Sequence, residues 1–229
     1  MSLFWTKNAV KEVVRRHWTG RAETFDQGLT HAPHSPEQVQ AWQSLLERWA
    51  GAQPIDILDV GCGTGFLALQ LAGLGHRASG ADFAETMIER ARTKAAEQRL
   101  EVRFDVADAE NLPYADEAFD LVIERHVAWT LPDPSGAFIE WRRVLRPGGR
   151  LILIEGQWSR PDSPRTSMHA DYHEIQDTLP FYGGATAVEL SAAVQTAGFP
   201  EPSVESLMDP ALWGGPVDRE RYALHAIKR

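Results

Sequence analysis

Residues 59–66 read Asp-Val-Gly-Cys-Gly-Thr-Gly-Phe, and this octet decides how the rest of the chain is interpreted. It ends the short apolar run 55–60 and opens the apolar segment 66–74, so we expect a strand to pass into a helix here. Its three glycines allow the backbone to turn sharply and to approach a ligand closely. The glycine spacing is not that of a dinucleotide-binding loop, because Phe66 stands at the sixth position, and no Gly-Lys-Ser/Thr phosphate loop follows.

Beyond residue 54, strand-like apolar runs alternate with helical patterns. Such alternation predicts an α/β fold, a doubly wound and mostly parallel sheet with helices on both faces. No helix separates the last two strands, so we expect the final strand to run in reverse. The expected strands are 55–60, 76–81, 101–107, 119–124, 150–155, 203–208 and 222–228, and the expected helices are about 66–74, 83–98, 134–145 and 187–198.

The N-terminal 50 residues are predicted to form helices. One spans about 7–18, and a second starts at Ser35 followed by Pro36, a typical cap and first position, and stops at Gly51. The segment 156–184 is polar and proline-rich, and we interpret it as an insertion over the C-terminal edge of the sheet, where α/β folds bind ligands. We therefore expect a single domain, 1–229, with a helical lid at 1–50 and a cover insertion at 156–184.

Composition narrows the function classes. The 229 residues are 43% hydrophobic and 24% charged, as in ordinary globular proteins, and no apolar run is long enough to cross a bilayer. The net charge is −9 with no basic cluster, which disfavours nucleic acids and membrane surfaces as partners. The single cysteine excludes an intramolecular disulfide, and the cytoplasm is the expected compartment. A monomer or homodimer is expected.

Acidic residues stand at the ends of the second and third expected strands. Asp82 comes 21 residues after Gly61, where a carboxylate accepts hydrogen bonds from both hydroxyls of a ribose. Phe83 follows and is placed to lie against a purine face. Asp108, Ala109 and Glu110 follow the third strand, where they are placed to accept a hydrogen bond from an adenine amino group. Together these positions predict a nucleoside site that requires no phosphates.

Five motifs in order resemble those of class I S-adenosylmethionine-dependent methyltransferases. They are DVGCGTGF, GADFAETMIERAR, DAENLPY, FDLVIERHVAWTLPD and VLRPGGRLILIE. The likeness is closer to the bacterial small-molecule enzymes grouped as type 11. It covers about residues 55–155 by motif and 185–229 more weakly. It implies S-adenosylmethionine as cofactor and a seven-stranded sheet of order 3-2-1-4-5-7-6 with the seventh strand antiparallel.

The resemblance also implies which positions contact the cofactor. The glycine loop would line the methionine end, with Arg125 beside it, and the strand-end residues would bind the ribose and adenine. Carried over position by position, the implied cofactor-binding residues are Asp59, Gly61, Cys62, Gly63, Gly65, Asp82, Phe83, Met87, Asp108, Ala109 and Arg125.

His126 is the candidate catalytic base, because it follows the fourth strand, where this fold delivers groups to the transferring methyl. A buried structural histidine is the alternative. Five residues of the lid, the insertion and the loop after the fourth strand are candidate contacts for the acceptor: Phe25, Trp129, His169, Tyr172 and Tyr182. We expect no metal, because His169 and His173 would need a third ligand, and Asp171 at this helical spacing would face elsewhere.

The expected reaction is in-line transfer of a methyl group to nitrogen, oxygen or carbon of a small, aromatic or heteroaromatic acceptor of the natural-product type. Enzymes that methylate nucleic-acid amino groups carry an Asn/Asp-Pro-Pro-aromatic motif after the fourth strand, where this chain has Glu124 to Val127. Enzymes acting on cytosine carbon need a Pro-Cys nucleophile, and Cys62 lies elsewhere. An oxidoreductase is disfavoured by Phe66. A non-catalytic module of the same fold that binds S-adenosylmethionine stays open as an alternative.

Overall fold

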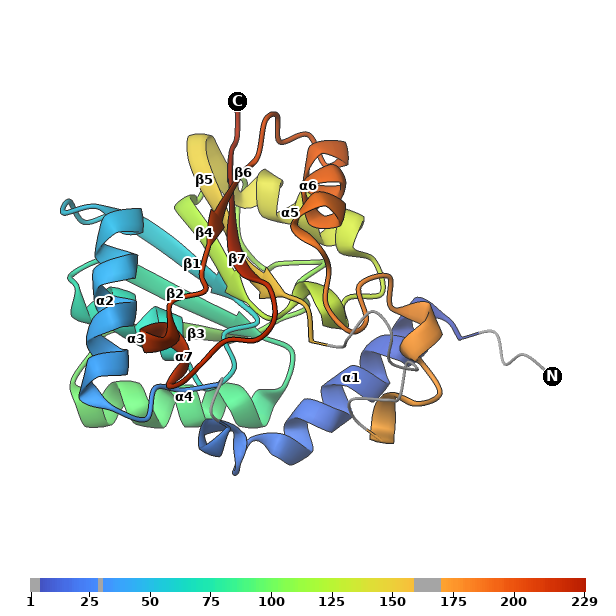
Figure 1. The fold of residues 1–229 in the computed structure, drawn as a ribbon, viewed down its shortest axis with the longest axis horizontal. Coiled ribbons are helices and arrows are strands. Elements are labelled where there is room, and N and C mark those ends of the chain that lie inside the picture. The colour runs from blue at the N-terminus through green and yellow to red at the C-terminus, as the bar shows by residue number, and fades with distance from the viewer. Residues whose placement is uncertain (1–4, 29–30, 159–169) are drawn as a thin grey trace.

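A seven-stranded sheet with the order β3-β2-β1-β4-β5-β7-β6 forms the centre of the computed structural model, which describes residues 5–28, 31–158 and 170–229 (Figure 1). Strands β1 to β5 pair in parallel, and β7 runs antiparallel to both β5 and β6. This confirms the predicted order and the reversed last strand. The strands are β1 Asp56–Val60, β2 Arg77–Asp82, β3 Arg103–Val106, β4 Phe119–Arg125, β5 Leu145–Gly156, β6 Ser203–Ser206 and β7 Arg221–Ile227.

Helices cover both faces of the sheet. On one face α2, α3 and α4 pack through Trp42, Phe66 and Ile88, and on the other α5 and α6 pack through Phe138 and Leu190 (Figure 1). Full burial of such side chains contributes about 1.5–3 kcal/mol each. The helices are α1 Lys7–Arg21, α2 Pro36–Ala50, α3 Phe66–Gly73, α4 Glu85–Gln98, α5 Pro134–Val144, α6 Ala187–Thr196 and α7 Pro210–Trp213, with 3-10 turns η1 Phe25–Gln27, η2 Ala128–Thr130, η3 Ala170–Tyr172 and η4 Gln176–Thr178.

Local capping explains where several helices begin. The Ser35 hydroxyl accepts the Gln38 N–H at 3.2 Å and begins α2, and Gly51, with φ +83°, ends it. Before α6, Thr186 and Glu189 form a reciprocal capping box. None of the helices within the described ranges is long and apolar enough to cross a membrane.

The two N-terminal helices have different positions. Helix α2 belongs to the main layer, where Trp42 packs edge-on against Phe66 with ring centroids 5.5 Å apart. Helix α1 instead lies at the edge of this layer, where the Thr19 carbonyl accepts the Thr86 hydroxyl of α4 at 3.1 Å, and beside residues 170–178 (Figure 1). There His17 Nδ1 lies 2.8 Å from Asp171 Oδ2. Within the first 50 residues, lid-like contacts therefore belong to α1 and to the segment that follows it.

Strand β5 begins five residues earlier than the predicted strand. Leu145 already pairs with Phe119, and the register then shifts so that Arg150 pairs with Leu121. The extra residues between them form a bulge in the strand. The short helix α7 is also absent from the sequence prediction, because its four residues are too few for a periodic pattern.

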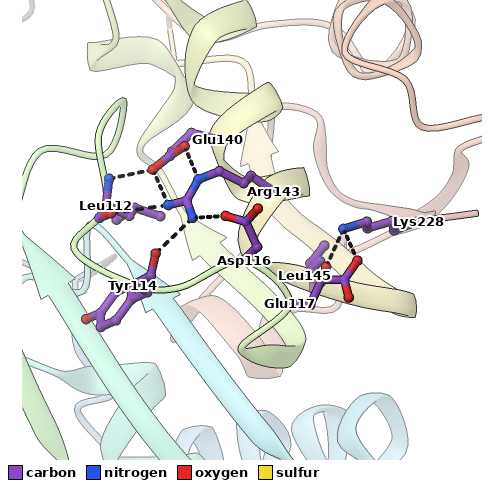
Figure 2. A network of polar contacts seen from close by, with 8 residues as sticks. All are labelled: Leu112, Tyr114, Asp116, Glu117, Glu140, Arg143, Leu145 and Lys228. Carbon is purple, nitrogen blue, oxygen red and sulfur yellow. Dashed lines mark hydrogen bonds and ion pairs between the residues drawn. The ribbon is translucent and has the colours of Figure 1, made fainter.

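The long connection from β3 to β4 is tied to α5 by one arginine (Figure 2). The Arg143 guanidinium donates to both carboxylate oxygens of Glu140 and to Asp116, at 2.6–2.8 Å. It also donates to the backbone carbonyls of Leu112 and Tyr114. Because these bonds use its whole donor fork, Arg143 fixes the segment that follows Asp108 to Glu110.

Candidate functional site

A cavity of about 260 Å³ lies at the carboxyl ends of β1, β2, β3 and β4. Its floor is formed by Gly61, Asp82, Asp108 and Arg125, which stand at or just after the ends of these strands. The strand order reverses between β1 and β4, and open α/β sheets bind ligands at such a point. The volume is close to the lower limit of the roughly 300–1,000 Å³ of typical ligand pockets.

The glycine loop forms one wall and requires glycine at two positions. Gly61 has φ +64°, and a Cβ there would lie 2.3 Å from Cγ2 of Val127. Gly63 has φ +53°, and a Cβ there would lie 3.2 Å from the ring of Phe25. The backbone of the loop is therefore pressed between the turn after β4 and the segment after α1.

Asp82 joins the glycine loop to the start of α4. Its Oδ2 accepts the Gly63 N–H at 2.9 Å, and its Oδ1 accepts the Ala84 N–H at 2.8 Å. Burial raises the pKa of Asp82, and these N–H groups oppose that shift. A carboxylate offers about four lone-pair positions, so Asp82, which lines the cavity, keeps acceptor capacity for two hydroxyl groups.

Lys11 of α1 closes the acidic end of the cavity. Its Nζ lies 2.7 Å from Asp108 Oδ2 and 2.6 Å from Glu110 Oε2, and all three residues line the cavity. Burial lowers the pKa of Lys11, but the two hydrogen-bonded carboxylates raise it above its ordinary value. Sequence reasoning missed Lys11, because nothing in the local pattern connects it to a motif 97 residues away.

Aromatic rings line another part of the cavity wall. The Trp18 ring meets those of Phe25 and Trp129 edge-on, with centroids 5.8 and 6.1 Å apart. The His31 ring stacks on Phe25 at 4.2 Å, and Trp158 lies 4.3 Å from the ring of His126. These six residues line the cavity, so this part of its wall is suited to a flat, largely apolar group.

His126 lies in the wall with a strained backbone and a neutral ring. Its φ is +63°, uncommon for a non-glycine residue, and its N–H donates to the Ile154 carbonyl at 3.0 Å. Burial holds the pKa of His126 well below the usual histidine value. A neutral imidazole keeps one lone pair, so the ring is a proton acceptor at neutral pH.

His31 is a second imidazole facing the cavity. Its Nδ1 lies 2.9 Å from the Phe25 carbonyl oxygen, and because a carbonyl only accepts, Nδ1 carries the hydrogen. The lone pair of the neutral ring is then on Nε2. Burial lowers the pKa of His31, and Arg125 adds to this effect while donating to the His31 carbonyl. Sequence reasoning did not select His31, since it lies outside every motif.

Arg125 is half-buried between the glycine loop and α2. Its guanidinium lies over the ring of Phe66 at 4.5 Å and over that of Trp42 at 5.2 Å. Burial lowers the pKa of Arg125 to about 10, although nearby Asp59 opposes this shift. Arg125 lines the cavity, where it places a positive charge close to the glycine loop.

Most of the predicted site residues line the cavity. They are Phe25, Gly61, Gly63, Asp82, Phe83, Met87, Asp108, Ala109, Arg125, His126 and Trp129. Five others lie behind its wall rather than on it. Asp59, Cys62 and Gly65 support the glycine loop from below, and Tyr172 and Tyr182 pack with Val10 in an apolar cluster behind Trp129.

Three of these buried residues have clear structural roles. The Asp59 carboxylate accepts the Ala68 N–H at 3.0 Å and so caps α3, while burial raises the pKa of Asp59 to about 7. Gly65 has φ +86° at the start of the same helix. Burial raises the pKa of the Cys62 thiol, which leaves it unreactive. His169 lies outside the described residues.

No group of three or more His, Cys, Asp or Glu side chains suited to a metal ion occurs in the ranges that the structure describes. The carboxylates of Asp82 and Asp108 are instead paired with backbone N–H groups and with Lys11.

Comparison with known proteins identifies this arrangement. The family described as "Methyltransferase domain" matches residues 58–153, which hold the glycine loop, the acidic strand ends and the turn with His126. Residues 58–153 of this chain are a methyltransferase domain. Among the methyltransferases to which it is similar, a demethylmenaquinone methyltransferase of Thermus thermophilus is 43% identical over 134 residues, 57% of this chain and 59% of the relative.

Two further comparisons extend the methyltransferase likeness. A ubiquinone/menaquinone biosynthesis C-methyltransferase of Bdellovibrio bacteriovorus is 29% identical over 220 residues, 92% of this chain and 90% of the relative. The solved structure of Haemonchus contortus phosphoethanolamine N-methyltransferase 2 with S-adenosyl-L-methionine has a TM-score of 0.71 at 16% identity, over 96% of this chain and 60% of that one. The latter shows the shared fold. The chain spans under two thirds of the length of the Thermus relative.

Proposed function

We propose that this methyltransferase transfers the methyl group of S-adenosylmethionine to a nitrogen, oxygen or carbon of a small aromatic or heteroaromatic acceptor. The observation that carries the proposal is one cavity lined both by acidic residues at strand ends and by a group of aromatic rings. Asp82, Asp108 and Glu110 supply acceptors for a nucleoside, and the rings around Trp18 supply a slot for a flat molecule.

The proposed cofactor position follows from the strand ends. Asp82 accepts hydrogen bonds from the two ribose hydroxyls, and Asp108 accepts one from the adenine amino group. Phe83, Met87 and Ala109 line the space for the adenine ring. The methionine end of the cofactor lies against Gly61, Gly63 and Arg125. Behind the glycine loop stand its supporting residues, Asp59, Cys62 and Gly65.

The main task of the protein in this reaction is to align the methyl donor with the acceptor. Bound S-adenosylmethionine supplies an activated methyl group on a sulfonium centre. The chain holds the acceptor in line and excludes water, an effect that accounts for roughly 7–11 kcal/mol of barrier in well-oriented reactions. Where the acceptor must lose a proton, His126 or His31 accepts it. General base catalysis of this kind increases the reaction rate about 10²–10⁴-fold. No residue arrangement for a metal is needed for these steps.

The relatives support an aromatic acceptor. The names of the Thermus and Bdellovibrio relatives refer to menaquinone and ubiquinone biosynthesis. We propose a quinone-like or natural-product acceptor for this chain, bound against Trp18, Phe25 and Trp129. We further propose a cytoplasmic enzyme, monomeric or homodimeric, with no nucleic acid among its substrates.

The test is formation of S-adenosylhomocysteine from S-adenosylmethionine with a panel of reduced quinones, phenols, aromatic amines and aliphatic amines. We expect turnover with flat aromatic acceptors and little with aliphatic ones. Turnover confined to aliphatic amines would contradict the acceptor class. Binding of S-adenosylhomocysteine without turnover on any member would favour the alternative, a non-catalytic module of this fold.

A further inference from the structure

Two glutamates are buried at the ends of neighbouring strands. Glu124 on β4 is 0% exposed and Glu155 on β5 is 1% exposed. The two strands pair in parallel, with Arg125 opposite Ile154, so both side chains belong to the edge that carries the cavity. Neither carboxyl group forms an ion pair with any described residue. Two buried carboxylates that form no ion pair are strongly unfavourable unless a proton neutralises one of them.

Both carboxyl groups bind the same turn. Val127 donates its N–H to Glu124 Oε2 at 2.8 Å, and Ala128 donates its N–H to Glu155 Oε1 at 2.8 Å. The remaining oxygens, Glu124 Oε1 and Glu155 Oε2, are buried and accept no hydrogen bond from the part of the chain that the structure describes. Each carboxyl group thus has one oxygen that accepts a backbone N–H and one oxygen without a donor. The two N–H groups belong to consecutive residues, Val127 and Ala128.

We propose that Glu124 and Glu155 share one proton and act together as a positioning unit for the turn 126–128. A proton between the two free oxygens turns one group into a donor and leaves the other as its acceptor, so both are satisfied at once. The unit holds the turn in which His126 adopts φ +63° and Val127 closes on Gly61. The inference goes beyond the proposed methyl transfer, because the shared proton belongs to the folded chain without any acceptor.

The charges around the pair favour this state. Burial raises the pKa of Glu124, and the charge of Glu155 raises it further, as does Asp59 from β1. Burial also raises the pKa of Glu155 to about 8, although Arg221 from β7 opposes the shift. Arg125, on the same strand as Glu124, is the other nearby cation.

One further titratable group faces the pair from β7. The Tyr222 hydroxyl donates to the Ala185 carbonyl at 2.9 Å, so its hydrogen is already in use. Burial and the charges of Glu155 and Glu124 raise the pKa of Tyr222, which keeps it neutral throughout the accessible pH range. The proton between the carboxyl groups therefore comes from solvent on folding.

The sign of the pH dependence follows directly. In the unfolded chain both carboxyl groups ionise near pH 4.5, whereas the folded pair keeps one proton up to about pH 8. The folded state binds more protons in this window, so stability is full below the unfolded pKa and declines as pH rises toward the folded pKa. Because the folded state holds one more proton than the unfolded chain, the folding equilibrium constant falls tenfold for each unit by which the pH rises.

The experiment compares urea unfolding at several values between pH 6 and 8 for wild type, Glu124→Gln, Glu155→Gln and the control Glu47→Gln, an exposed position on α2. Glutamine keeps the carbonyl for the turn and donates its amide hydrogen to the remaining carboxylate. We expect the folding constant of wild type and of Glu47→Gln to fall about tenfold more per pH unit than that of either buried variant. Equal slopes in all four proteins overturn the proposal.

A second measurement does not depend on the variants folding. In wild type labelled with ¹³C at the glutamate carboxyl groups, one resonance should titrate well above the ordinary range, together with the amides of Val127 and Ala128. Absence of such a resonance overturns the proposal even if the glutamine variants unfold. A protein that fails to methylate any acceptor would still give both results, so the two proposals fail separately.

Discussion

Lys11 Nζ lies 2.7 Å from Asp108 Oδ2, and this contact joins a helix at the start of the chain to the acidic strand end 97 residues later. The same ammonium group binds Glu110 at 2.6 Å. The Lys11 side chain is 15% exposed, so solvent screens these pairs less than it screens surface ion pairs. The contact therefore holds α1 over the acidic end of the cavity.

Replacing Lys11 with alanine should loosen this closure. Asp108 and Glu110 would lose their common cation, and α1 would open more often, so we expect S-adenosylhomocysteine to dissociate about tenfold faster, equivalent to roughly 1.4 kcal/mol. Stopped-flow fluorescence, using the tryptophans around the cavity, measures the rate. Lys7→Ala is the matched control on the same helix, because Lys7 pairs with Asp133 at an exposed site. Equal rates for Lys11→Ala and Lys7→Ala would argue against the closure.

Asp82 should carry much of the affinity for the cofactor. Replacing Asp82 with alanine removes the acceptor for two ribose hydroxyls, and charge-assisted bonds of this kind are worth on the order of 1.5–3 kcal/mol. We expect calorimetric titration with S-adenosylhomocysteine to show about 10–150-fold weaker binding, which is the same range expressed as a ratio. Asp105→Ala, one strand away, is the control, since Asp105 bonds Tyr114 and Arg103 instead. Wild-type affinity in Asp82→Ala refutes the ribose role.

The parts of the fold that follow local rules were predicted well. The octet 59–66 marks a strand, a loop and a helix within a few residues, and caps such as Ser35 and Thr186 mark helix starts. The bulge that begins β5 at Leu145 escaped prediction, because the sequence around it is also typical of a helix stop followed by a turn. Pairing with β4, a long-range contact, decides between these two structures.

Site residues could be predicted from the sequence where they stand at a strand end. They could not be predicted where the cavity is lined by segments distant in the sequence. Asp82 and Asp108 follow from their strands, but Lys11 and His31 reach the cavity through tertiary packing that no spacing rule describes. Tyr172 was predicted to touch the acceptor because it lies in the insertion. It is instead fully buried beside His17, at 5.0 Å between ring centroids, since a large aromatic side chain next to α1 contributes more by packing there.

The network in Figure 2 predicts a stability effect separate from the chemistry. Arg143→Ala removes the bonds to Glu140, Asp116 and the neighbouring backbone. The side chain is 31% exposed, so we expect a loss of about 1–2 kcal/mol in the free energy of unfolding, measured by urea denaturation. Arg142→Ala is the matched control, because Arg142 bonds only the Gly198 and Arg229 carbonyls among the described residues. An unchanged unfolding midpoint in Arg143→Ala would show that the network is dispensable.

The two imidazoles in the cavity give the last prediction, which separates their roles in turnover. Burial lowers the pKa of both rings, so each is neutral at pH 7 and able to accept a proton. His31 has its Nδ1 hydrogen fixed on the Phe25 carbonyl, which leaves Nε2 as the acceptor, whereas Nε2 of His126 is buried without a described partner. An acceptor that must lose a proton has two places to deliver it. The base should be His31 if the acceptor lies against Nε2 of His31, and His126 if the acceptor lies against Nδ1 of His126.

Variants His31→Gln and His126→Gln should distinguish these cases in rate profiles from pH 5 to 9. Loss of the base should lower kcat about 10²–10⁴-fold, abolish the acidic limb of the profile and leave the affinity for S-adenosylhomocysteine nearly unchanged. The acidic limb should lie below pH 6.5, because the pKa of each ring is lowered. The other variant should act mainly on the KM of the acceptor. His34→Gln, whose ring contacts the Gly28 carbonyl, is the control. Wild-type kcat and an unchanged acidic limb in both cavity variants would remove both histidines from the chemistry and leave alignment by the aromatic walls as the source of rate.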